Sequence, residues 1–344
     1  MRRAGAMIAT IAALLVPPGA GNLVAAPAQL GQSHLVVIVG AAGGDVYQQV
    51  FHNWAVQLID AAGDLLGLTP DQITYLGEDP ELDPQRISAR SNRDNVQLTF
   101  NRLASETGPD DRIFVVLIGH GSGEGERSRF NIPGPDVTAV EYDAMLDLFV
   151  TQEIGFVNTA SASGDFATVL AGPNRVIVTA TRDGRQSNQT VFPRFFVEAF
   201  AQDVADLDKD ERVSLLEAYT YASREVKRFY DDDGRMLTET SQLEDNGDGK
   251  GTYAPLPGEA DGALARRMFL DNPMNSIDTA EGPATDDPEL RALYVDQRRL
   301  REQIEDLRLL KTSMDVELYA AELEKLLIEL ARTDQEIRAR GGGR

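Results

Sequence analysis

The sequence Arg112-Ile-Phe-Val-Val-Leu-Ile-Gly-His-Gly-Ser122 is an apolar run that ends in glycine and small polar residues, and a second such run follows it, Ile154-Gly-Phe-Val-Asn-Thr-Ala-Ser-Ala-Ser-Gly-Asp-Phe166. Each run has the length and the β-branched and aromatic content of a buried strand that stops at a loop. If the two strands are parallel neighbours, His120 and Ser161 lie together at their carboxyl ends. Open α/β sheets bind their ligands at that edge.

Strands and helices alternate on both sides of this pair. Strand-like runs occupy residues 35–39, 73–76 and 175–179, and helical periodicity is present at 46–66, 92–106 and 192–201. This alternation is typical of right-handed βαβ units. The sequence therefore predicts a three-layer α/β/α domain with a mostly parallel sheet over residues 29–254.

The two turns resemble those of the caspase and legumain-like peptidases. His120-Gly121-Ser122 corresponds to the histidine turn, and Ala160-Ser161-Ala162-Ser163-Gly164 corresponds to the nucleophile turn, where the legumain-like pattern is Ala-Cys-Glu-Ser-Gly. The separation of 41 residues (161 minus 120) is also similar to that of the family. The resemblance implies a caspase-like fold in which Ser161 stands where the cysteine is expected.

The resemblance also implies roles for these residues. His120 would be the general base, Ser161 the nucleophile, and the amides of Gly121 and Ser161 the oxyanion hole. A serine hydroxyl needs a well-oriented base, and no motif assigns an orienting carboxylate to His120. We therefore expect a pseudopeptidase that binds peptide or protein partners through a retained His120/Ser161 cleft. The alternatives are an active hydrolase with these two residues as base and nucleophile, and a calcium-dependent structural or interaction protein of the envelope.

The loop after the predicted strand 175–179 forms the primary pocket in similar peptidases. Here the loop contains Arg182, Asp183 and Arg185. The arginines would favour an acidic side chain of the substrate, and the aspartate would favour a basic one. The sequence does not choose between them.

The composition excludes several classes of function. The chain has 33 basic and 55 acidic residues and a net charge of −22, which argues against nucleic acid and anionic lipid as partners and favours cations. There is no cysteine, so disulfides, thiolate zinc sites and thiol catalysis are excluded. With three histidines in all, neither zinc nor haem is expected. The glycines at 40–44 lack the pattern of a nucleotide-binding loop, so no nucleotide is expected.

Residues 206–217 have the spacing of an EF-hand calcium loop. The expected ligands at loop positions 1, 3, 5, 7, 9 and 12 are Asp206, Asp208, Asp210, Arg212 through its backbone carbonyl, Ser214 and Glu217. Glu211 departs from the pattern, which calls for glycine at that position. The alternative is that these carboxylates cap the amino terminus of the helix that follows.

The two ends of the chain carry different patterns. Residues 1–28 have a basic start, a short apolar run and an Ala26-Pro27-Ala28 cleavage site, which predicts a signal peptide and export to the periplasm or the medium. No membrane span is expected in the mature chain. Residues 255–287 are typical of a linker. Residues 288–340 predict an α-helical hairpin or coiled coil with possible self-association, the alternative being helices that pack back on the domain.

Overall fold

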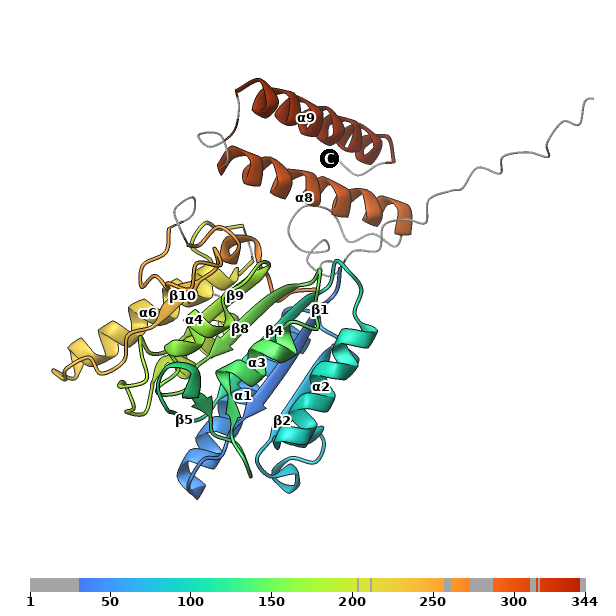
Figure 1. Cartoon of the computed structure of the whole chain (residues 1–344). Coiled ribbons are helices and arrows are strands. Elements are labelled where there is room, and N and C mark those ends of the chain that lie inside the picture. The colour runs from blue at the N-terminus through green and yellow to red at the C-terminus, as the bar shows by residue number, and fades with distance from the viewer. Residues whose placement is uncertain are drawn as a thin grey trace, which may run out of the picture.

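The computed structural model describes residues 31–202, 204–210, 212–256, 261–272, 287–309, 314 and 316–340. Its centre is a mixed, mostly parallel seven-stranded sheet in the order β10-β9-β8-β4-β1-β2-β3, in which β10 alone runs antiparallel to its neighbour (Figure 1). In chain order the strands of this sheet are β1 (Ser33–Val39), β2 (Ile73–Gly77), β3 (Ala89–Arg90), β4 (Arg112–Ile118), β8 (Glu153–Asn158), β9 (Arg175–Thr179) and β10 (Gln242–Glu244).

The three central strands are buried on both faces of the sheet. Strand β4 pairs with β1 from Ser33↔Arg112 to Val39↔Ile118 and with β8 from Arg112↔Glu153 to Leu117↔Asn158. Their apolar side chains therefore need no alternation with polar ones, which explains the continuous apolar runs in the sequence. The same pairing brings the loops after β4 and β8 to one edge of the sheet.

Helices cover both faces of the sheet and complete three layers. One apolar core lies between the sheet and α1 (Asp45–Asp64), α5 (Phe192–Ala201) and α6 (Leu215–Asp232). A second core lies between the other face and α2 (Arg93–Glu106), α3 (Ala139–Leu146) and α4 (Asp165–Leu170). Single-turn 3-10 helices occur at Pro70–Gln72, Pro80–Leu82, Gly125–Arg127 and Ala265–Arg267.

Two parts of the architecture were not predicted from the sequence. A small antiparallel sheet consists of β5 (Gly121–Ser122), β6 (Arg129–Phe130) and β7 (Val137–Thr138), and it joins the loop after β4 to α3. Helix α3 begins at a capping box in which the side chains of Thr138 and Glu141 each accept from the other residue's amide. These elements are too short to give a periodic pattern.

Residues 261–272 pack onto the domain, although the sequence placed them in a linker. Met268 and Leu270 belong to the core between the sheet and α1, α5 and α6. Phe269 forms a β-bridge with Ser214 at the start of α6. These apolar side chains alternate with polar and glycine-rich stretches, so the average composition of the segment hides them.

The chain ends in two helices, α8 (Pro288–Leu309) and α9 (Val316–Ala339), which we call the C-terminal helix pair. Leu290 and Tyr294 of α8 cluster with Ile337 of α9, and Gln297 donates a hydrogen bond to Asp334 at 2.6 Å. The two helices are therefore antiparallel. In Figure 1 they lie near the amino-terminal ends of the strands, on the opposite side of the domain from β5.

Some predictions fall outside the described residues. The signal peptide at 1–28, most of the connection between α8 and α9, and Glu211 of the calcium-type loop all belong to this group. No helix among the described residues combines the length and the apolar character needed to cross a bilayer.

Candidate functional site

His120 and Ser161 lie at one edge of the sheet, as the sequence predicts. Strands β4 and β8 are hydrogen-bonded parallel neighbours. The pairing continues past the end of β8, where Thr159 N donates to Leu117 O at 3.0 Å. His120 follows β4 after one glycine, and Ser161 follows β8 after two residues. The topology thus brings together the two residues on which the resemblance depends.

The Ser161 hydroxyl faces the backbone of Gly121. Gly121 N donates to Ser161 Oγ at 3.4 Å, and Ser161 Oγ donates to Gly121 O at 3.4 Å. The amide expected in an oxyanion hole therefore contacts the hydroxyl itself. The serine is 3% exposed, so its hydroxyl has little contact with solvent.

The two turns approach so closely that Gly121 has no room for a side chain. A Cβ atom built on Gly121 would lie 2.3 Å from the carbonyl oxygen of Ser161. Ala162, the residue after Ser161, has a left-handed φ of 51°, which is costly for a residue other than glycine. Its amide donates to Gln186 O at 2.9 Å, and this bond holds the strained turn in place.

The loop after β9 supports the nucleophile turn through a buried hydroxyl. Thr181 Oγ1 accepts from the amide of Ser163 at 2.8 Å and from the amide of Gly164 at 3.0 Å. Thr181 itself is fully buried. Because both amides are satisfied by this hydroxyl, the turn keeps its shape without a bound ligand.

The His120 ring packs against two aromatic side chains at the start of α1. It meets the rings of Tyr47 and Phe51 edge to face, with centroids 5.3 Å and 5.1 Å away. Burial lowers the pKa of His120, and a hydrogen bond to the backbone of Ala42 opposes this by raising it. The net effect is a lowered pKa, so the ring is neutral at pH 7 and able to accept a proton.

No hydrogen bond between the His120 ring and a carboxylate is present among the described residues. The backbone of Ala42, which acts to raise the pKa of His120, has its amide bonded to Glu78 Oε2 at 3.2 Å. Asp165, which is near in sequence, accepts from Gly125 N at 2.8 Å and Ser128 Oγ at 2.9 Å instead. Within the described part of the chain, no hydrogen bond joins the His120 ring to Ser161.

The predicted substrate loop packs directly on the nucleophile turn. A Cβ atom on Gly164 would lie 2.1 Å from the carbonyl carbon of Arg182, so the two backbones are in contact. Asp183 accepts from Arg185 Nη2 at 2.8 Å and from the Arg185 amide at 3.0 Å, and Arg182 Nε lies 3.7 Å away. The hydrogen bond from Arg185 holds the pKa of Asp183 below its usual range.

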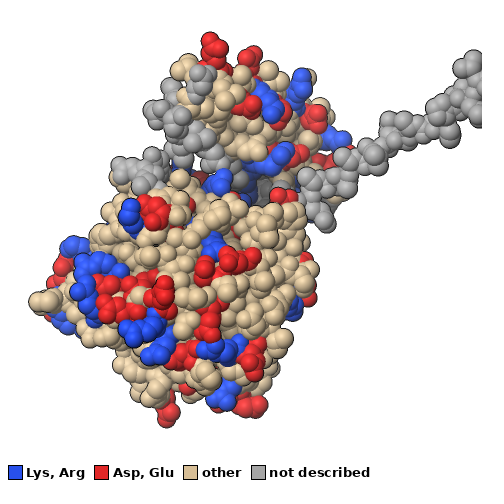
Figure 2. Space-filling view, in the orientation of Figure 1, with Lys and Arg blue, Asp and Glu red and all other residues tan. Residues whose placement is uncertain are grey.

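The three charged side chains of this loop differ in exposure and pairing. The Asp183 side chain is 19% exposed and shared by two guanidinium groups, whereas Arg182 and Arg185 are 64% and 75% exposed. The two arginines are thus more exposed than the aspartate, and the carboxylates of Glu124 and Asp165 also interact with Arg185. On the face shown in Figure 2, basic and acidic side chains are intermixed.

Three of the expected calcium ligands come together in space. Carboxylate oxygens of Asp206, Asp208 and Asp210 all lie within 4.8 Å of one another. Asp206 Oδ1 accepts from the amides of Lys209 at 2.6 Å and Asp210 at 3.2 Å, and Lys209 has a left-handed φ of 62°. Partial burial and the neighbouring Asp208 raise the pKa of Asp210 to about 6.

The remaining expected ligands have other partners. Glu217 Oε1 accepts from the amide of Leu207 at 2.9 Å, while its Oε2 accepts from the amide and hydroxyl of Ser214, the cap of α6. The Arg212 guanidinium turns away to Asp271 at 2.7 Å and stacks over Phe269. Glu217 and Ser214 thus serve the helix cap that the sequence offered as the alternative.

The sequence analysis missed several residues that position the site. Ala42 and Tyr47 follow β1, and Thr181 follows β9, so all three lie at the same carboxyl edge as His120 and Ser161. Applying the carboxyl-edge rule to every strand would have drawn attention to these loops. Their individual contacts depend on tertiary packing and have no sequence pattern.

Known proteins do not place the chain in a family. A scan against protein-family models finds no match, and a search of curated proteins finds no relative. The geometry of the His120/Ser161 edge and the resemblance of its two turns are therefore the features that bear on function.

Proposed function

We propose that this chain is an exported homologue of the caspase and legumain-like peptidases that binds a peptide or protein partner and is inactive or very slow as an enzyme. The support is the position of the two turns after neighbouring parallel strands, together with their residues, His120-Gly121-Ser122 and Ala160-Ser161-Ala162-Ser163-Gly164. Export to the periplasm or the medium is supported by the pattern of residues 1–28.

The hydrogen bonds and the burial of the Ser161 hydroxyl are the reason for proposing that the chain is inactive as an enzyme. The hydroxyl is 3% exposed and bonded to Gly121, and no hydrogen bond joins it to the His120 ring in the part of the chain that the structure describes. A serine is a weak nucleophile unless an adjacent base removes its proton. A base held in the wrong arrangement loses a factor of about 10⁴ in serine hydrolases. Binding of a partner does not require the proton of the Ser161 hydroxyl to be removed.

The charge of the loop beside Ser161 suggests the chemistry of the partner. Arg182 and Arg185 are exposed, and Asp183 between them accepts a hydrogen bond from Arg185. Glu124 and Asp165 interact with Arg185 as well, so Arg182 is the less neutralised of the two arginines. A guanidinium group binds a carboxylate through two parallel hydrogen bonds. We therefore propose that the partner presents an aspartate or glutamate side chain to this loop.

Cleavage of a diverse peptide library tests the catalytic part of the proposal. The mature chain and its Ser161→Ala variant are both expected to leave the library intact over hours. Ser161→Cys is the informative third arm, because a thiol is partly ionised near neutral pH and needs less help from His120. Cleavage by the parent that disappears in Ser161→Ala would instead establish a serine hydrolase.

We also propose that the loop at 206–217 binds calcium, because three of its carboxylates converge within 4.8 Å of one another. Asp206, Asp208 and Asp210 would bind the ion, with Arg212 O, Ser214 and Glu217 as the expected further ligands. Calcium prefers such carboxylate and carbonyl oxygens. If the ion dominates the biology of the protein, the chain is a calcium-dependent interaction protein, and the peptide site is secondary.

A thermal melt with added calcium tests the loop. A ligand at 100 times its Kd stabilises a folded protein by about 2.7 kcal/mol, so millimolar calcium should raise the Tm by several degrees. Asp208→Ala should abolish the rise. An equal rise in Asp208→Ala, or none in the parent, would count against the calcium site, and magnesium at equal concentration controls for ionic strength.

A further inference from the structure

Helix α9 carries apolar side chains that stay exposed among the described residues, away from the cluster that it forms with α8. The face toward α8 includes Ile337, which is buried against Leu290 and Tyr294. A different line of residues, including Leu327 and Ile328, remains 46% and 45% exposed in the part of the chain that the structure describes. Isolated exposed leucines are common, but a continuous apolar stripe along a surface helix marks a contact surface.

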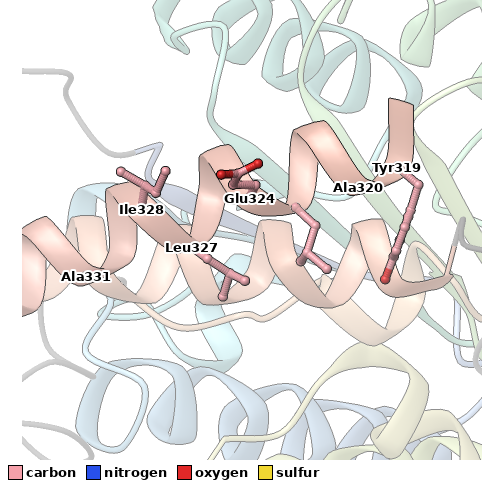
Figure 3. A pocket seen from close by; sticks show the side chains of 7 residues that line it. Tyr319, Ala320, Glu324, Leu327, Ile328 and Ala331 are labelled. Carbon is pink, nitrogen blue, oxygen red and sulfur yellow. The ribbon is translucent and has the colours of Figure 1, made fainter. Parts of the chain in front are cut away.

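This second face is a shallow groove of about 410 Å³ (Figure 3). Figure 3 shows Leu327, Ile328 and Glu324 along the helix, with Tyr319 at one end and Ala331 toward the other. The groove is lined by Tyr319, Ala320, Leu323, Glu324, Leu327, Ile328 and Ala331. We call these residues the α9 groove. Its small residues, Ala320 and Ala331, leave room for side chains of an opposing helix to enter.

The charges beside the α9 groove change sign along the helix. Residues spaced by seven lie on one line along a helix that packs against another, and the line through the groove is Glu317, Glu324, Ala331 and Arg338. Its amino-terminal half is acidic, and its carboxyl-terminal end is basic. A parallel second copy of α9 would set like charges against like, whereas an antiparallel copy sets acid against base.

We propose that two copies of this chain associate through their α9 grooves, with the two α9 helices antiparallel about a two-fold axis near Leu327 and Ile328. Residues pair when their numbers sum to 655, so Glu317 of each copy lies opposite Arg338 of the other, and Leu327 lies opposite Ile328. A two-fold interface repeats every contact, so the charge pair occurs twice. The same symmetry sets Glu324 opposite Ala331, where no like charge opposes it.

Sedimentation velocity of the full mature chain tests the proposal. The parent should pass from monomer to dimer below about 100 µM, the weak end of specific association. Leu327→Gln with Ile328→Gln should remain monomeric over the same range. Lys325→Gln is the matched control, since Lys325 is exposed on another side of the same helix and should leave the dimer unchanged.

A charge exchange distinguishes this interface from any other. Glu317→Arg and Arg338→Glu should each weaken self-association about tenfold, because each homodimer then repeats a like-charge pair. An equimolar mixture of the two variants should recover the dimer, since every pair in the mixed species is opposite in charge. Recovery of the dimer would support the antiparallel arrangement, and its absence would overturn it.

Single cysteines test the orientation directly, because the chain has no cysteine of its own. Ile328→Cys, close to the axis, should form a disulfide-linked dimer under mild oxidation. Arg338→Cys should not, because its counterpart lies at the far end of the antiparallel partner. Crosslinking of Arg338→Cys but not Ile328→Cys would contradict the proposal, as would a parent that is monomeric at every concentration tested.

Discussion

Gly121 and Ser161 show how one pair of residues fixes the geometry of the site. The glycine is required because the carbonyl of Ser161 occupies the space of a side chain, at 2.3 Å from a Cβ atom. The resulting contact satisfies the hydroxyl of Ser161 with backbone partners, and no hydrogen bond among the described residues joins that hydroxyl to the His120 ring. The Ser161 hydroxyl is thus held by the neighbouring turn and not by His120.

Gly121→Ala should destabilise the protein by about 2 kcal/mol, the cost of forcing atoms into a packed site. Denaturant unfolding of the mature chain measures this as a lower midpoint with an unchanged slope. Gly63→Ala is the matched control, because Gly63 lies in α1 and its Cβ would have an ordinary contact at 3.9 Å. That variant should be more stable by about 0.5–1 kcal/mol, and equal effects in the two variants would contradict the close contact.

The side-chain roles at this edge were only partly predictable. The sequence indicated His120 and Ser161, because each follows an apolar run at a glycine-rich break. It could not indicate Thr181 or Ala42, since a hydroxyl and a peptide group become functional only through the atoms beside them. The sequence also could not show that Asp183 is paired with Arg185 while both neighbouring arginines are exposed, because all three residues have turn-like surroundings in sequence.

At the scale of elements, the strands and helices with long patterns were predicted well. Helix α5 spans residues 192–201 as expected, and β4 and β8 follow from their continuous apolar runs. Strand β10 and helix α3 were missed, because three and eight residues give too little periodicity. Residues 261–272 were assigned to a linker for a related reason, since Met268 and Leu270 are few among many prolines, glycines and aspartates.

The loop before α6 makes a prediction about pH. The raised pKa of Asp210, about 6 against 3.8 when unfolded, means that the folded state binds the proton more tightly. The stability from this group is therefore fully present below pH 3.8 and is lost as the pH rises through 6. Without calcium, Asp210→Asn should stabilise the protein at pH 7 by about 1 kcal/mol, a figure reduced for the screening of exposed carboxylates.

Unfolding in EDTA at pH 4 and pH 7 measures this effect of Asp210→Asn. The gain over the parent should shrink toward zero at pH 4, where the parent carboxyl is already protonated. Glu126→Gln, which neutralises an exposed carboxylate outside the loop, should show no such gain. A variant that is less stable than the parent at pH 7 in EDTA would contradict the crowding of charge in this loop.

At the scale of the whole molecule, the candidate site and the C-terminal helix pair lie at different ends of the domain. The pair is drawn near the amino-terminal ends of the strands, and His120 and Ser161 lie at the carboxyl ends (Figure 1). Self-association through α9 would therefore leave both peptide sites of a dimer open. A bivalent molecule of this kind would hold a partner with two acidic segments more tightly than a single segment.

The most direct measurement of the central claim is peptide binding by fluorescence anisotropy, followed by mass spectrometry of the peptide. Peptides enriched from a library on the mature chain should contain an acidic residue, should bind the parent and Ser161→Ala equally, and should be recovered intact. Arg182→Gln with Arg185→Gln should weaken binding about tenfold, and Arg224→Gln, which changes an arginine of α6 outside this loop, should not. A library without any bound peptide, or a peptide cleaved by the parent and spared by Ser161→Ala, would contradict the account.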